Sequence, residues 1–180
     1  LLDQPCPVER MSAVYALGRN PCPSAVQKLV SLLESDDNAY VRRATAWSLA
    51  NYDNQIVLEP LINALKNDVA AVRLWSSSSL AEIGNVSFEN AQLAAEQLLI
   101  SLKIDNESGV RSNCIWSLCR LFEKLDNTFQ ECFVDECTKI ALFDKEPSVM
   151  EEAKTALDSM GMQGFLSLIH ISEPTRLDHI

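Results

Sequence analysis

Apolar residues recur at helical spacing along most of the chain, and the pattern is clearest over residues 37–67. One face of a first helix there carries Val41, Thr45, Ser48 and Leu49. After a turn at residues 52–54, one face of a second helix carries Val57, Leu58, Leu61, Ile62 and Leu65. Two such stripes predict a helix–turn–helix unit. Neither helix can bury its apolar face alone, so the unit needs copies of itself as packing partners.

Such copies precede and follow this unit. A valine followed eight residues later by a leucine marks four first helices, at Val41/Leu49, Val72/Leu80, Val110/Leu118 and Val149/Leu157. An earlier copy ends at Leu17 and has Glu9 in the valine position. Successive valines are about 31 to 39 residues apart, which is typical of two-helix solenoid repeats. The pattern therefore predicts an all-α stacked solenoid of about five repeats, the last of them lacking its second helix.

Two charged residues keep a fixed place in these repeats. In the first four repeats an arginine directly follows the valine position, and these residues are Arg10, Arg42, Arg73 and Arg111. The fifth copy has Met150 there. Four or five residues before each valine stand Asp37, Asp68, Asp105 and Asp144. The aspartate can accept hydrogen bonds from the free amides that open a helix, and the arginine can reach carboxylates of a neighbouring repeat. We predict that these residues form a structural ladder between repeats.

The repeat sequence resembles a known family. Residues 68–84, DVAAVRLWSSSSLAEIG, preceded by LEPLINAL at residues 58–65, are similar to HEAT repeats of the phycobilisome-lyase-like family, cyanobacterial type. The resemblance covers nearly all of residues 5–160 and implies an α-α superhelix of the HEAT/armadillo-like kind. Members found with phycobilisomes attach, isomerise or remove bilins. Other relatives act only as adaptors, and one type resembles a partner of iron-sulfur assembly proteins.

Three functions are compatible with this resemblance. The first is a non-catalytic protein-binding scaffold, linked to phycobiliprotein or cofactor assembly. The second is a subunit of a bilin lyase or isomerase, which would hold a phycocyanobilin-type bilin and present it to a cysteine of the substrate protein. The third is an iron-sulfur assembly partner. We favour the scaffold over an enzyme.

Both ends of the sequence depart from the repeats. The chain begins at Leu1 without a methionine, and we expect the solenoid, residues 1–165, to be truncated at both ends. Residues 166–180 read LSLIHISEPTR and then LDHI, which resembles a translated sequencing adapter, so we expect a non-native tail. Both histidines, His170 and His179, lie in that tail. Residues 1–165 therefore lack the histidines that Ser-His or Cys-His hydrolases, zincins and HEAT-fold di-iron hydroxylases require.

Composition narrows the class of partner. The 180 residues carry a net charge of -10, with 15 Lys+Arg against 25 Asp+Glu. A protein that tracks a nucleic-acid backbone needs a basic stripe, so a protein partner is favoured over nucleic acid. No apolar run approaches the ~20 residues of a membrane span. With no signal peptide ahead of its cysteines, the chain is expected to be cytoplasmic.

The six cysteines are expected to be free thiols. Four of them form two pairs five residues apart, Cys114/Cys119 and Cys132/Cys137, and there is no CxxC. Five helical residues rotate a side chain by about 140°, so neither pair shares a helix face. A metal or cluster site is possible only if the sulfurs of the fourth repeat converge across its two helices. We name no metal-binding and no catalytic residue.

Candidate binding residues lie six positions after the valine position of each repeat. This position carries aromatic residues in three repeats and small ones in the others: Tyr15, Trp47, Ser78, Trp116 and Thr155. It lies about 150° from the apolar stripe, at roughly 100° per residue. The aromatics are either a platform for a flat bilin, anchors for a protein partner, or side chains covered by neighbouring repeats.

Each candidate function predicts a different geometry. A bilin site requires a groove between Trp47 and Trp116, and a scaffold requires a broad shallow surface. Arginines of the repeats could clamp the bilin propionates, and Arg43 is the best candidate because it lies outside the ladder. Trp75, three residues after its marker, is expected to pack at the core boundary.

Overall fold

The structure is a computed structural model that describes residues 1–53 and 55–161. Within these ranges the chain is helical and forms no strand. The first helices of the repeats are α1 (Pro7–Arg19), α3 (Ala39–Leu49), α5 (Ala70–Gly84), α7 (Ser108–Leu121) and α9 (Pro147–Ser159). The second helices are α2 (Val26–Ser35), α4 (Leu58–Asn67), α6 (Phe88–Ile104) and α8 (Asn127–Phe143).

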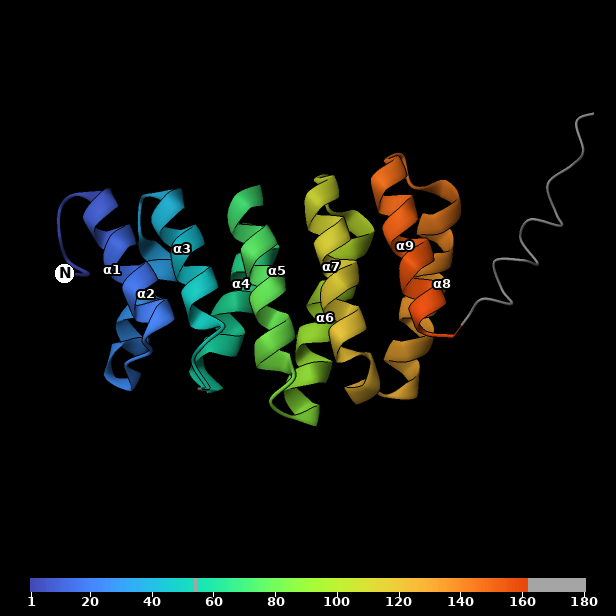
Figure 1. The fold of residues 1–180 in the computed structure, drawn as a ribbon, viewed down its shortest axis with the longest axis horizontal. Helices are drawn as coiled ribbons and strands as arrows, with labels where there is room; N and C mark the ends of the chain where they lie inside the picture. Colours follow the sequence, from blue (N-terminus) through green and yellow to red (C-terminus); the bar gives the residue numbers. More distant parts are fainter. Residues whose placement is uncertain (54, 162–180) are drawn as a thin grey trace, which may run out of the picture.

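The helices stack in chain order along the long axis of the molecule (Figure 1). Each first helix packs on the first helices of the adjoining repeats, and the second helices form a parallel layer behind them. This arrangement is the predicted all-α solenoid. The marker valines and leucines of the second to fifth repeats are at most 1% exposed, so the repeated pattern is the core that joins the two layers.

Local sequence explains where the helices begin. Proline at the first position opens α1 and α9, where a missing amide hydrogen costs nothing. The side chains of Asn38, Ser87 and Asp126 accept hydrogen bonds from the first amides of α3, α6 and α8. Short 3-10 turns, Pro23–Ala25, Gln55–Val57 and Phe122–Lys124, lie between the two helices of a repeat.

The fifth repeat contributes α9 to the described part of the chain. The predicted absence of its second helix and the predicted tail at residues 166–180 both concern residues outside the described part of the chain. None of the described helices combines the length and apolar character that crossing a membrane requires.

Candidate partner-binding site

An arginine–aspartate ladder runs along one edge of the solenoid. Each arginine of the first four repeats makes two hydrogen bonds, 2.7 to 3.0 Å long, to the aspartate that follows the same repeat's second helix; the pairs are Arg10–Asp36, Arg42–Asp68, Arg73–Asp105 and Arg111–Asp144. The remaining terminal nitrogen of Arg42, Arg73 and Arg111 donates to the backbone oxygen of the preceding ladder aspartate. Each of these guanidinium groups therefore bridges two consecutive turns between repeats.

The first aspartate of the ladder is Asp36. We predicted Asp37 for this place, and that prediction was wrong. Asp36 is the C-cap of α2, as Asp68, Asp105 and Asp144 are of α4, α6 and α8. Asp37 is one residue further along and is exposed. The ladder carboxylates also do not cap the first turn of the next helix. They accept from amides of the inter-repeat turn instead, such as Asn38 and Glu107.

Three ladder carboxylates have a lowered pKa: Asp36, Asp105 and Asp144. Burial would raise the pKa of each group. Hydrogen bonds from the paired arginine and from a turn amide, together with the arginine charge, outweigh burial and hold the pKa below its usual range. The ladder therefore stabilises the ionised form of these aspartates and has a structural role.

The predicted aromatic candidates fall into two different environments. Tyr15 and Trp47 are half-buried and pack on each other across α1 and α3, with ring centroids 5.4 Å apart. Trp47 lies over Gly18, where an added Cβ would come within 2.3 Å of the indole. Neighbouring repeats thus partly cover both side chains.

Gly18→Val should destabilise the protein by about 2 kcal/mol, because the added side chain overlaps the Trp47 ring and the backbone of Ser48. Thermal unfolding followed by circular dichroism measures the loss. Gly109→Ala is the matched control, since a Cβ there meets only Leu74, at 3.5 Å. If both variants unfold at the same temperature, Trp47 does not occupy this interface.

The surface of α5 and α7 carries exposed tryptophans. Trp116 is 41% exposed, and Trp75, which we predicted to pack at the core boundary, is 37% exposed. The Arg120 guanidinium lies 5.1 Å from the centre of the Trp116 ring and pairs with Glu82 of α5 at 2.9 Å. An open hollow of about 350 Å³ beside Trp116 is lined by Ser78, Gly109, Ser112, Asn113 and Glu152.

The structure does not bring Trp47 and Trp116 to one groove. Helix α5 packs between the helices that carry them, and the hollow beside Trp116 is not lined by Trp47. Arg43 lies near the other end of the solenoid, with its guanidinium 5.3 Å from the centre of the Tyr40 ring. The four predicted binding residues therefore do not form a single site. The geometry is that of a broad surface.

The cysteines do not form a cluster. The described residues contain no group of three or more His, Cys, Asp or Glu side chains that could hold a metal ion. Cys114 and Cys137 are buried, and burial raises the pKa of both thiols well above the usual range. Burial also raises the pKa of Cys119, to about 11. A thiol must lose its proton to bind a metal, so these side chains fit packing better than ligation.

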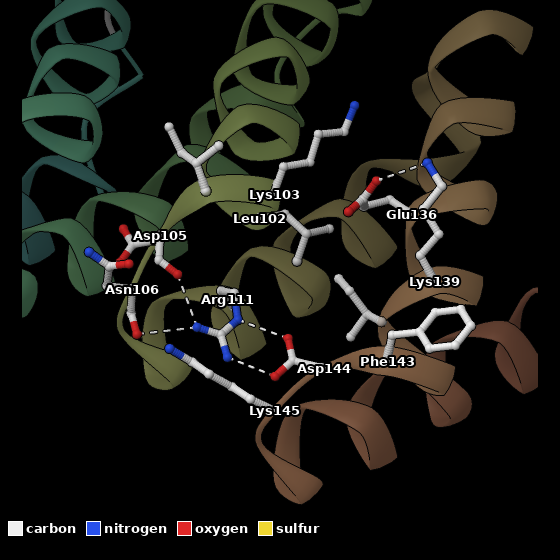
Figure 2. A pocket seen from close by; sticks show the side chains of 12 residues that line it. Leu102, Lys103, Asp105, Asn106, Arg111, Glu136, Lys139, Phe143, Asp144 and Lys145 are labelled. Atoms are coloured by element: carbon white, nitrogen blue, oxygen red, sulfur yellow. Dashed lines mark hydrogen bonds and ion pairs between the residues drawn. The ribbon is translucent and has the colours of Figure 1, made fainter.

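A second hollow, of about 410 Å³, lies between the C-terminal ends of α6 and α8 (Figure 2). Its polar floor is the pair Arg111–Asp144, and Phe143 and Lys103 lie at its margin. Phe143 is 79% exposed and Ile104, which also lines the hollow, is 72% exposed. Lys139 pairs with Glu136 at 3.6 Å.

Sequence reasoning missed several residues of these two surfaces. Arg120 follows Trp116 by four residues, the spacing at which helical side chains meet, and this signal was available. Ile104 and Phe143 directly precede ladder aspartates, where the first two repeats have Ser35 and Asn67. Aligning the helix ends, as well as the helix markers, would have found them.

Comparison with known proteins identifies the repeat type. The family described as HEAT repeats matches residues 1–81 and 26–119. A designed armadillo-repeat protein in complex with the peptide (KR)4 has a TM-score of 0.62 at 20% identity, covering 97% of this chain and 90% of that chain. The complex of CpcE and CpcF of phycocyanin lyase from Nostoc sp. PCC7120 has a TM-score of 0.59 at 22% identity, covering 83% and 98%. No curated protein sequence matches significantly.

Proposed function

Because the chain belongs to the HEAT-repeat family, we propose that it is a protein-binding scaffold whose partner docks on the surface of α5 and α7. The observation that carries this proposal is the exposure of Trp75 and Trp116 on two adjoining first helices. Tryptophan is enriched among the residues that dominate binding energy, and large side chains left outside the core favour a surface that a partner covers.

The surroundings of Trp116 suit a protein interface. Arg120 and Glu82 place both signs of charge around the indole, as in the polar rim of an interface. The hollow beside the ring is shallow and lined by small or polar side chains, so a partner's backbone can approach closely. These features support docking of a folded or extended polypeptide.

The partner that we propose is a phycobiliprotein or a component of cofactor assembly. This assignment is supported by the resemblance of residues 68–84 to phycobilisome-lyase-like repeats. The similarity in fold to the complex of CpcE and CpcF of phycocyanin lyase also supports it.

Binding to isolated phycocyanin subunits tests this proposal. Replacing both Trp75 and Trp116 with alanine should weaken binding by at least about tenfold, because truncating each side chain should cost more than about 1 kcal/mol of binding free energy. Biolayer interferometry measures the affinity. Phe88→Ala is the control, since Phe88 is also exposed but begins α6 in the other layer. Equal binding by the double variant and the native chain would reject this surface. Absence of binding to either subunit would reject the phycobiliprotein partner.

A bilin lyase subunit is the second candidate, and the hollow beside Trp116 favours it over other catalytic functions. A flat indole face with Arg120 above it could hold a tetrapyrrole ring and one of its carboxylates. Titration with phycocyanobilin, followed by visible absorbance, should then give a saturable red shift that Trp116→Ala removes and Trp47→Ala retains. Titration without a spectral change would leave the scaffold as the proposed function.

A further inference from the structure

The hollow between the ends of α6 and α8 has an apolar margin that repeat stacking does not require. Ile104 and Phe143 are the last residues of their helices and are largely exposed. The corresponding residues of α2 and α4 are Ser35 and Asn67, and those repeats stack with the same ladder geometry. A polar residue therefore satisfies the structural role of this position. The two large apolar side chains indicate a surface that another molecule covers.

The uncompensated charge around this hollow is positive. The carboxylates of Asp105 and Asp144 are held by Arg73 and Arg111. Lys139 is paired with Glu136, whereas Lys103 and Lys145 form no ion pair with any residue of the described chain. The chain as a whole carries -10, so this basic margin contrasts with the rest of the molecule. It favours an anionic partner.

The second repeat provides an internal comparison. A hollow of about 600 Å³ lies in the equivalent place between α2 and α4 and is lined by Glu34, Asn63, Asn67 and Val69. Asn63, Asn67 and Val69 correspond to Lys139, Phe143 and Lys145 of the fourth repeat. The larger hollow therefore lacks a large apolar residue at the end of either helix and lacks the free lysines; its exposed apolar residue is Val69. Both features occur at the ends of the third and fourth repeats, where the ladder keeps the same geometry.

We propose that the hollow between α6 and α8 binds an acidic, amphipathic peptide segment of a protein partner. Leucine or phenylalanine side chains of the peptide pack against Ile104 and Phe143, while its carboxylates lie next to Lys103 and Lys145. The site is on the second-helix layer and uses none of the residues of the tryptophan surface, so it does not depend on the function proposed above.

Fluorescence anisotropy with a pair of synthetic peptides tests this site. The probe is a labelled twelve-residue helical peptide with glutamates on one face and leucine and phenylalanine on the other. Its partner carries lysine in place of every glutamate. We expect saturable binding of the acidic peptide, weakened at least about tenfold by the charge reversal and reduced by added salt. Equal affinity for the two peptides would overturn the proposal.

A triple variant tests whether these residues form the peptide site. It replaces three residues of the fourth repeat with the corresponding residues of the second. The triple variant Lys139→Asn, Phe143→Asn, Lys145→Val should fold normally, because the second repeat tolerates these residues, and should lose at least about tenfold in peptide affinity. Asn67→Ala and the Trp75/Trp116 double variant should bind the peptide as the native chain does. Unchanged binding in the triple variant overturns the proposal. So does a concentration-dependent dimer in sedimentation that the triple variant abolishes, since the occupant would then be a second copy.

Discussion

Replacing Arg111 with alanine should lower the free energy of unfolding by about 3 kcal/mol, because the substitution leaves a buried carboxylate without its counter-charge. The side chains of Arg111 and Asp144 are only 6% and 8% exposed, and the arginine also donates to the backbone oxygens of Asp105 and Asn106. Loss of this group breaks two hydrogen bonds at the turn before α9 and two at the turn before α7. Urea denaturation followed by circular dichroism measures the change.

Arg120→Ala is the matched control for this prediction. Arg120 also pairs with a carboxylate of another helix, but the side chains of Arg120 and Glu82 are 44% and 46% exposed. Exposed pairs contribute at most about 1 kcal/mol, so the control should lose much less stability. Hydrogen exchange should further show that Arg111→Ala opens α9 first, since the ladder joins that helix to the fourth repeat. Equal losses in the two variants would contradict a structural role for the ladder.

Acid should unfold the protein by titrating the ladder. The folded-state pKa of Asp36, Asp105 and Asp144 is below the unfolded value of about 3.9. A lowered pKa contributes stability that is fully present above the unfolded pKa and is lost as the pH falls through the folded pKa. The melting temperature should therefore stay level near neutrality and fall as the pH drops below about 4.

Asp144→Asn tests the sign of this effect. The amide cannot ionise, so the variant should be less stable than the native chain at pH 7 and approach it at low pH. Melting curves of the variant and the native chain, recorded from pH 7 to low pH, measure the difference in stability. A difference that stays constant with pH would show that the lowered pKa of Asp144 contributes nothing to stability.

The fold was predictable because stacking depends on local spacing. The valines and leucines that mark the repeats are buried, as their periodicity predicted. The arginines that directly follow the valine position of the first four repeats form one side of the ladder. The aspartate side was less certain at the first turn. Asp36 and Asp37 lie within the four-to-five-residue window, and only the end of α2 distinguishes them.

Exposure of the aromatics could not be predicted from repeat position alone. Trp47 and Trp116 stand at the same place in their repeats, but the preceding first helices differ. Trp47 fits over Gly18 of α1, whereas the corresponding residue of α5 is Ala81, which has a Cβ. The environment of Trp47 thus depends on a residue of the preceding repeat, which its own place in the repeat does not reveal.

The ladder makes the two edges of the solenoid respond differently to solvent. Ion pairs with nearly buried carboxylates lie where the second helices end, whereas the opposite edge is joined by the exposed pair Arg120–Glu82 and by bonds such as those of the Tyr52 hydroxyl with Leu17 and Cys22. Acid, which protonates the ladder carboxylates, weakens the first edge more than the second. We expect the packing of the repeats at that edge to loosen at low pH. A partner that spans several repeats would then bind with a pH dependence even where its own contacts do not ionise.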